Sequence, residues 1–244
     1  MKYIEKPNLP QGKVTLAAIS YEAGEAIKKL NSLGIKTLKI SSNPNLPIPV
    51  NSHADLQLLH TGFEQIFSLE HLFSGENAKK FKCTTIKQKA GNKYPEDVRL
   101  NCTIIDNILI CNEKTVAPEI LEFAYVSEFR IVNVNQGYSR CSICIINENA
   151  IITDDKSIYT AAGNFLNDVE FVSKGSIGLD GYNYGFIGGC CGKIDKNTIA
   201  FNGRIESHAD YKIIIDALNR NNVGFVELTD KPLYDIGGII PLCE

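Results

Sequence analysis

An internal repeat constrains the fold of this chain more than any other feature. Three segments, "CTIIDNILICN" (Cys102–Asn112), "CIINENAIITD" (Cys144–Asp154) and "GKIDKNTIAFN" (Gly192–Asn202), each join two short apolar runs through a turn rich in Asn or Asp. Such a pattern predicts a β-hairpin. The isoleucines interpreted as equivalent, 41 and 49 residues apart, are Ile104, Ile145 and Ile194. A period in this range is typical of repeat architectures.

A glycine motif repeats with the same spacing. "FIGGCC" begins at Phe186 and "DIGGII" at Asp235, so that Ile187 and Ile236 are again 49 residues apart. Each hairpin is followed by a helical pattern and another strand, as in residues 113–129 and 130–135. The glycines come before a strand and not before a helix, so we interpret them as allowing close backbone packing rather than binding phosphate.

The whole chain fits five such units. Residues 14–20 and 35–41 predict strands around a helix over 21–34, and a weaker helix is predicted over 70–82. The chain begins and ends inside a unit, so the two termini are expected to complete one blade together. The sequence therefore predicts a five-bladed α/β-propeller of strand-helix-strand-strand repeats, as a single domain over residues 1–244.

Composition and charge argue against several classes of function. The net charge is -3 and no run of Lys or Arg is present, which argues against binding to nucleic acid. No window has the roughly 18 apolar residues that a membrane span needs. The polar N-terminus lacks the apolar stretch of a signal peptide, so we expect a cytoplasmic protein with no membrane partner.

The eight cysteines include one C-x-x-C pair, Cys141 and Cys144. A zinc site normally needs a second pair or two spaced histidines, and neither is present. The pair also falls in a predicted strand, where alternation would place the two thiols on opposite faces. We therefore predict no metal site and no cofactor.

Five units of this kind resemble the pentein fold of the guanidino-modifying enzymes, which include arginine deiminase, agmatine deiminase and amidinotransferase. The stretches "NQGYSRCSICII", "GYNYGFIGGCCGKI" and "LYDIGGIIPL" more closely resemble an uncharacterised clostridial family of that fold. The resemblance implies a site in the central channel, where the innermost strands begin. There a thiolate attacks the guanidinium carbon, a histidine moves protons and carboxylates hold the cation.

On this resemblance, the predicted catalytic residues are Cys141, His53 and Asp55. "GYSRC" resembles the run before the enzymes' nucleophile, and a strand would place His53 and Asp55 on one face. A small-molecule ligand is expected in the channel. The predicted substrate-binding residues are Asn101, Arg140, Asp180, Cys190 and Asp235.

The chain departs from the enzymes in two ways. "FIGGCC" has Ile187 and Cys190 where the enzymes have Glu and Asp, and the candidate histidine precedes the candidate cysteine by two units. Cys190 and Cys243 stay open as alternative nucleophiles. One hypothesis is a thiol-dependent hydrolase or transferase acting on a guanidino or amidine compound, with a depressed pKa at Cys141. The other is a catalytically inactive pentein that binds a protein or ribosomal partner.

Overall fold

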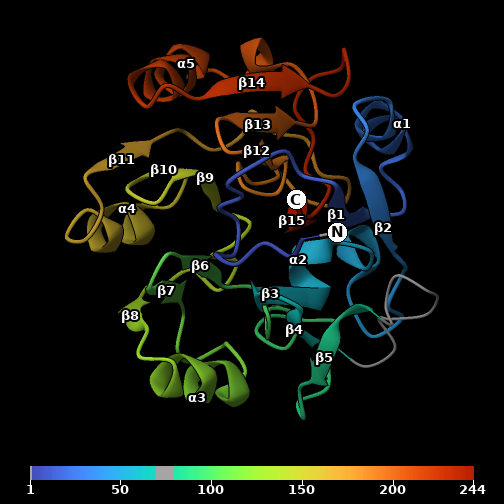
Figure 1. The fold of residues 1–244 in the computed structure, drawn as a ribbon, viewed down its shortest axis with the longest axis vertical. Coiled ribbons are helices and arrows are strands. Elements are labelled where there is room, and N and C mark those ends of the chain that lie inside the picture. The colour runs from blue at the N-terminus through green and yellow to red at the C-terminus, as the bar shows by residue number, and fades with distance from the viewer. Residues whose placement is uncertain (1, 70–79) are drawn as a thin grey trace.

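A computed structural model describes residues 2–69 and 80–244. Its strands form five three-stranded sheets that surround a common centre, with the longer helices at the periphery and one short helix near the centre (Figure 1). In every sheet the inner strand is antiparallel to the middle strand, and the middle strand is parallel to the outer strand. The predicted five-bladed α/β-propeller is confirmed. The helix predicted over 70–82 lies almost entirely outside the described residues.

The elements have the following bounds. The inner strands are β15 (Ile240–Cys243), β3 (Leu58–Gly62), β6 (Thr103–Ile105), β9 (Ile143–Asn147) and β12 (Cys191–Asp195). The middle strands are β1 (Leu16–Ser20), β4 (Gln65–Ser68), β7 (Ile108–Cys111), β10 (Ala150–Thr153) and β13 (Thr198–Phe201). The outer strands are β2 (Lys36–Ile40), β5 (Lys82–Thr85), β8 (Arg130–Asn133), β11 (Asp168–Phe171) and β14 (Gly224–Glu227). The helices are α1 (Gly24–Ser32), α2 (Ala54–Gln57), α3 (Pro118–Val126), α4 (Lys156–Ala162) and α5 (Tyr211–Arg220), with short 3-10 turns at Ile48–Val50 and Ile205–Ser207.

The two ends of the chain share one blade. Strand β15 near the C-terminus pairs with β1 near the N-terminus, with Leu16 opposite Cys243. The expectation that the termini complete one unit is therefore confirmed. This arrangement joins the last blade to the first and leaves no inner strand at an open end.

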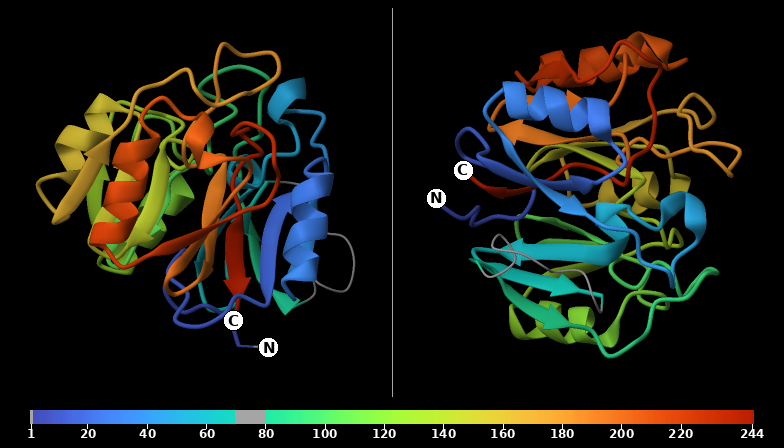
Figure 2. Two further views of the ribbon diagram at one scale, coloured as in Figure 1. Left: turned by 90° about the horizontal axis from the view of Figure 1, so that it is seen from above. Right: turned by 90° about the vertical axis from the view of Figure 1, so that its right-hand side faces the viewer.

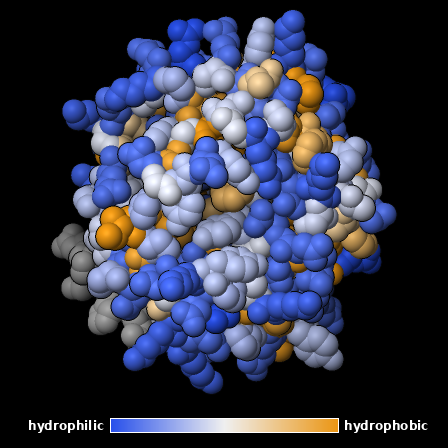
Figure 3. Space-filling view, turned by 180° about the vertical axis from the view of Figure 1, so that it is seen from behind, coloured by the Kyte–Doolittle hydropathy of each residue, from blue (hydrophilic) through white to orange (hydrophobic). Residues whose placement is uncertain are grey.

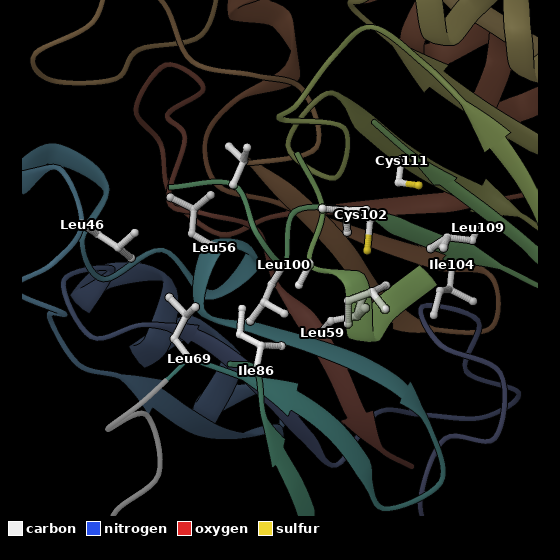
Figure 4. Packing of buried hydrophobic residues seen from close by; sticks show 14 of the residues in the cluster. Leu46, Leu56, Leu59, Leu69, Ile86, Leu100, Cys102, Ile104, Leu109 and Cys111 are labelled. Atoms are coloured by element: carbon white, nitrogen blue, oxygen red, sulfur yellow. The ribbon is translucent and has the colours of Figure 1, made fainter. Parts of the chain in front are cut away.

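Five apolar clusters, one between each pair of neighbouring blades, form the core. Strand alternation explains this, because successive side chains point to opposite faces. Ile104 packs with Leu59 of the preceding blade, whereas Ile105 packs with Ile145 of the following blade. Figure 4 shows the first of these clusters, including Leu59, Leu100, Ile104 and Leu109. Inner strands are buried on both faces, and β9 (ICIIN) and β15 (IPLC) accordingly are apolar along most of their length.

One predicted equivalence is shifted by a residue. Ile104 and Ile145 pair with the second residues of their middle strands, Leu109 and Ile151. In the fifth blade Lys193, not Ile194, takes this position and pairs with Ile199. A register shift between Lys193 and Asp195 displaces Ile194, which the sequence pattern did not reveal.

All five inner strands begin at the end of the propeller that lies away from the termini. The loop over residues 176–185 and helix α2 lie at this same end (Figure 2). Figure 3 views the molecule from this side and shows a largely hydrophilic face with apolar residues near its centre. Among residues 2–69 and 80–244, no helix has the length and apolar character required to cross a bilayer.

Candidate functional site

In four of the five repeats the same position lines one cavity of the ring. The residues five places before the five inner strands are His53, Val98, Tyr138, Phe186 and Asp235. Four of them, all except Val98, line one cavity of about 220 Å³. The residues two places before the strands include Leu56, Asn101 and Cys141, of which Leu56 and Cys141 line the cavity. The repeat register therefore determines which residues meet here.

His53 and Asp55 do not lie on one strand as predicted. The strand begins only at Leu58, and residues Ala54–Gln57 form the single-turn helix α2. The backbone N–H of Asp55 donates to the carbonyl oxygen of Gly237 at 3.1 Å, so a contact with another blade holds this turn. As a result the two side chains point to different partners.

Asp55 and Asn101 surround the thiol of Cys141. The Cys141 Sγ donates to Oδ2 of Asp55 at 2.9 Å, and Nδ2 of Asn101 lies 3.0 Å from the same sulfur. Oδ1 of Asn101 accepts the backbone N–H groups of Arg140 at 2.8 Å and Cys141 at 3.3 Å. Asn101 thus fixes the loop that carries the thiol, and all three side chains are buried.

His53 faces Asp235 across the ring. Nδ1 of His53 lies 3.7 Å from Oδ1 of Asp235, and both side chains are buried. The two oxygens of Asp235 also accept the backbone N–H groups of Phe186 and Gly237, each at 2.9 Å. The carboxylate is therefore held in place by backbone donors beside the imidazole.

The glycines of "FIGGCC" allow the loops to approach closely. A Cβ at Gly188 would collide with the carbonyl oxygens of Arg140, Cys141 and Ile143. A Cβ at Gly189 would collide with the carboxylate of Asp235. The interpretation of these glycines as positions of close backbone packing is confirmed.

The polar side of the cavity consists of Cys141, His53 and Asp235. Apolar and aromatic side chains make up most of the remaining wall, and the loop over 176–185 contributes four residues to it. The other lining residues are Val50, Leu56, Tyr138, Leu179, Tyr182, Asn183, Tyr184 and Phe186. A larger groove of about 800 Å³ also includes His53 and Asp235 and extends past Glu22, Asp180 and Tyr234.

The pKa of the Cys141 thiol is raised well above its usual value. Burial is the largest cause, and the nearby carboxylates of Asp55 and Asp235 add to it, whereas Asn101 acts in the opposite direction. Burial also raises the pKa of Asp235. The expected depressed pKa of Cys141 is therefore contradicted by its buried, acidic surroundings. A bound cation would favour the thiolate, because an opposite charge nearby stabilises the ionised form.

The other predicted site residues lie around this centre. Asp180 lines the larger groove, and the Arg140 side chain donates to the carbonyl oxygen of Ile143 at 3.1 Å. The Cys190 thiol packs in an apolar cluster and contacts the carbonyl oxygen of Ile187 at 3.2 Å. Cys243 lies in β15 inside another cluster. Within the described ranges, no three His, Cys, Asp or Glu side chains are arranged to hold a metal ion.

Two aromatic residues of the wall, Tyr138 and Phe186, were not among the predicted site residues. Their rings stack with centroids 5.7 Å apart, and the hydroxyl of Tyr138 donates to Asp97. Phe186 opens "FIGGCC" and Tyr138 stands in "GYSRC", each five places before an inner strand, so their shared place in the repeat was the available signal. Asp97 offered no signal, because it belongs to no repeated motif.

Three solved structures have similar folds. They are an inosamine-phosphate amidinotransferase from Streptomyces griseus, an agmatine deiminase from C. jejuni and a dimethylarginine dimethylaminohydrolase variant from Pseudomonas aeruginosa complexed with citrulline. Their TM-scores are 0.56, 0.52 and 0.52, at 9%, 8% and 8% identity. The matches cover 94%, 96% and 94% of this chain and 92%, 94% and 96% of those chains. These likenesses establish the pentein fold.

Sequence comparison gives one result. A model described as "Family of unknown function (DUF6873)" matches residues 18–240. No curated protein matches the chain significantly.

Proposed function

Because this chain belongs to DUF6873, whose description assigns no activity, we propose its function from the site itself. The proposed function is that of a thiol-dependent hydrolase or transferase acting on a C–N bond of an amidine or guanidine cation. One observation carries this proposal. The Cys141 thiol lines the same small cavity as His53 and Asp235, with the Asp55 carboxylate 2.9 Å from the sulfur.

The proposed chemistry begins with the binding of the cation beside two carboxylates. Its positive charge offsets the effects of Asp55 and Asp235 that hold the pKa of Cys141 high, so the thiol can transfer its proton to Asp55. The Sγ atom then attacks the amidinium carbon and forms a tetrahedral adduct.

The adduct collapses when a proton reaches the leaving nitrogen, which departs as ammonia or an amine. The imidazolium form of His53 is placed to donate this proton, because its ring lines the cavity and faces Asp235. Water, or a second amine in the adjoining groove, then attacks the S-linked carbon and gives a proton to the neutral His53. The C–S bond breaks, and Asp55 returns its proton to the sulfur. Water gives hydrolysis and an amine gives group transfer.

A second candidate is a binding module without chemistry, for a protein or ribosomal partner. The raised pKa of Cys141 favours it, as do Ile187 and Cys190 at the positions where the enzymes carry acids. The closer relationship to a clostridial family and a cytoplasmic location stay predictions.

Alkylation by a cationic and a neutral reagent separates the two candidates. The Cys83→Ser background removes the exposed thiol, and modification of Cys141 by 2-chloroacetamidine and by the neutral 2-chloroacetamide, which has the same leaving group, is followed by mass spectrometry at pH 7.5. An enzyme site should react at least about tenfold faster with the cation, since the cation lowers the barrier to forming the thiolate. Asp55→Asn should abolish this preference. Equal, slow reaction of Cys141 with both reagents would favour the binding module.

A further inference from the structure

We infer that the ligand of this cavity is an amidinium carrying an aromatic or alkyl substituent and no carboxylate. The inference deepens the proposed function, because it names the substrate class of the same site. It follows from the charge, the wall and the hydrogen-bonding capacity of the cavity, each of which is independent of catalysis.

The charges around the site select a cation without an acidic group. Asp235 lines the cavity, Asp55 lies directly behind the thiol, and no Lys or Arg from residues 2–69 and 80–244 lines it. The adjoining groove adds Glu22, Glu25 and Asp180, and the one Lys or Arg that the described residues contribute to it, Lys231, is paired with Glu25 at 2.8 Å. Neither space offers an unpaired basic side chain from the described chain to hold a carboxylate or phosphate. A zwitterionic amino acid therefore fits poorly.

The wall of the cavity suits a flat apolar group. Tyr138 and Phe186 stack at an interplanar angle of 23°, and Tyr184 meets Phe186 edge to face at 5.9 Å. The Tyr138 hydroxyl donates its proton to Asp97, so it has no proton left to donate to a ligand. Leu56, Leu179 and Val50 complete the apolar side. Aromatic rings also attract cations through their faces.

The same rings already attract a cation from outside the cavity. The Lys174 ammonium lies 5.8 Å from the ring centroids of both Tyr184 and Phe186, and 3.6 Å from Oδ2 of Asp155. Lys174 belongs to a separate hollow with Asp154 and Asp155 and does not line the site cavity. The rings of Tyr184 and Phe186 are therefore suited to a cation–π interaction.

The free hydrogen-bonding capacity of the site lies on its two carboxylates. The buried Oδ1 of Asp55 has no hydrogen-bond partner in the described structure, and each oxygen of Asp235 accepts one backbone N–H group and can accept a second hydrogen bond. An amidinium with a carbon substituent brings fewer N–H donors than a guanidinium head, so fewer of them are left unpaired in the cavity, which is unfavourable for a buried donor. Its substituent also fills the apolar side.

Binding to Cys141→Ala tests the inference without any reaction. Isothermal titration calorimetry compares benzamidinium with benzamide, which is neutral and of the same shape, and with L-arginine, which has a guanidinium and a carboxylate. We expect benzamidinium to bind at least tenfold more tightly than either. Tyr182→Ala should weaken it at least threefold and is safe for folding, because Tyr182 is 44% exposed. Phe186→Leu should also weaken it, whereas the matched control Tyr125→Ala, at an 82% exposed residue outside the cavity, should not.

The outcomes distinguish the inference from the proposed function. If benzamide binds as tightly as benzamidinium, the positive charge does not contribute to binding. If arginine binds as tightly as benzamidinium or more tightly, the cavity does not select an apolar ligand without a carboxylate. Either result overturns the inference. If no compound binds, the inference also fails. If benzamidinium binds as expected but Cys141 shows no preference for the cationic alkylating reagent, the inference stands and the enzymatic proposal fails.

Discussion

Replacing Asp154 by Asn should change how the stability of this protein depends on pH. Asp154 follows the middle strand β10, and its Oδ2 accepts the backbone N–H of Ile187 at 3.0 Å. Asn112 and Asn202 follow β7 and β13 in the same way, and their amides donate to loop carbonyl oxygens at 2.9 Å. An amide is therefore tolerated at this position of the repeat. Asp154 is buried, and its Oδ1 has no hydrogen-bond partner among the described residues.

The size of this pH effect on stability follows from the pKa of Asp154. Burial is the main cause that raises the pKa of Asp154 from 3.8 to about 7. The folded protein therefore keeps a proton that the unfolded chain loses above about pH 4, so wild-type stability falls as the pH rises from 4 to 7. The full shift corresponds to about 4 kcal/mol, of which about 2–3 kcal/mol falls between pH 5 and pH 8.

Urea unfolding at pH 5, 6, 7 and 8, at constant ionic strength, measures this effect. The free energy of unfolding of Asp154→Asn minus that of the wild type should increase by about 2–3 kcal/mol across this range, because all other titrating groups cancel. The exposed Asp230→Asn is the control and should show no such trend. A difference that stays constant from pH 5 to pH 8 would refute the argument that Asp154 is neutral in the folded protein.

Three further outcomes are expected. Gly189→Ala should lower the free energy of unfolding in urea by more than about 3 kcal/mol, because its Cβ would meet the Asp235 carboxylate. Gly12→Ala, with open space around it, should change the free energy of unfolding little, and similar losses in the two variants would contradict this reasoning. Burial lowers the pKa of Lys193 to about 8, so the free energy of unfolding of the wild type should rise by about 3 kcal/mol between pH 8 and 10.5. Lys193→Met should remove this rise, and a rise of the same size in the variant would show that another group causes it. Asp155→Ala should lower the free energy of unfolding by about 0.5–2 kcal/mol, because the Asp155 side chain caps α4 by accepting backbone N–H groups of its first turn. Thermal unfolding measures this, and an unchanged Tm would show that the cap does not stabilise the protein.

The repeat alone determined the fold and most of the site's positions. Equivalent units must bury equivalent strand faces, so the shared spacing of the hairpins and of the two glycine motifs identified the repeating units of the ring. Asp235 and Phe186 open the two glycine motifs, and Tyr138 stands in "GYSRC". Once the ring closes, these residues meet because they hold the same place in their units. Residues at equivalent positions of the sequence repeat therefore also occupy equivalent positions around the ring.

Tertiary structure alone decided which side chains pair and what charge they carry. Local sequence favoured a strand through His53 and Asp55, but the Asp55 N–H finds its acceptor in Gly237 of another blade, and a helical turn results. His53 then faces Asp235 while Asp55 meets Cys141. The raised pKa of Cys141 likewise arises from burial and from carboxylates distant in sequence, which no local pattern encodes. Desolvation and Coulombic effects depend on distances in space, and those exist only after the blades have packed.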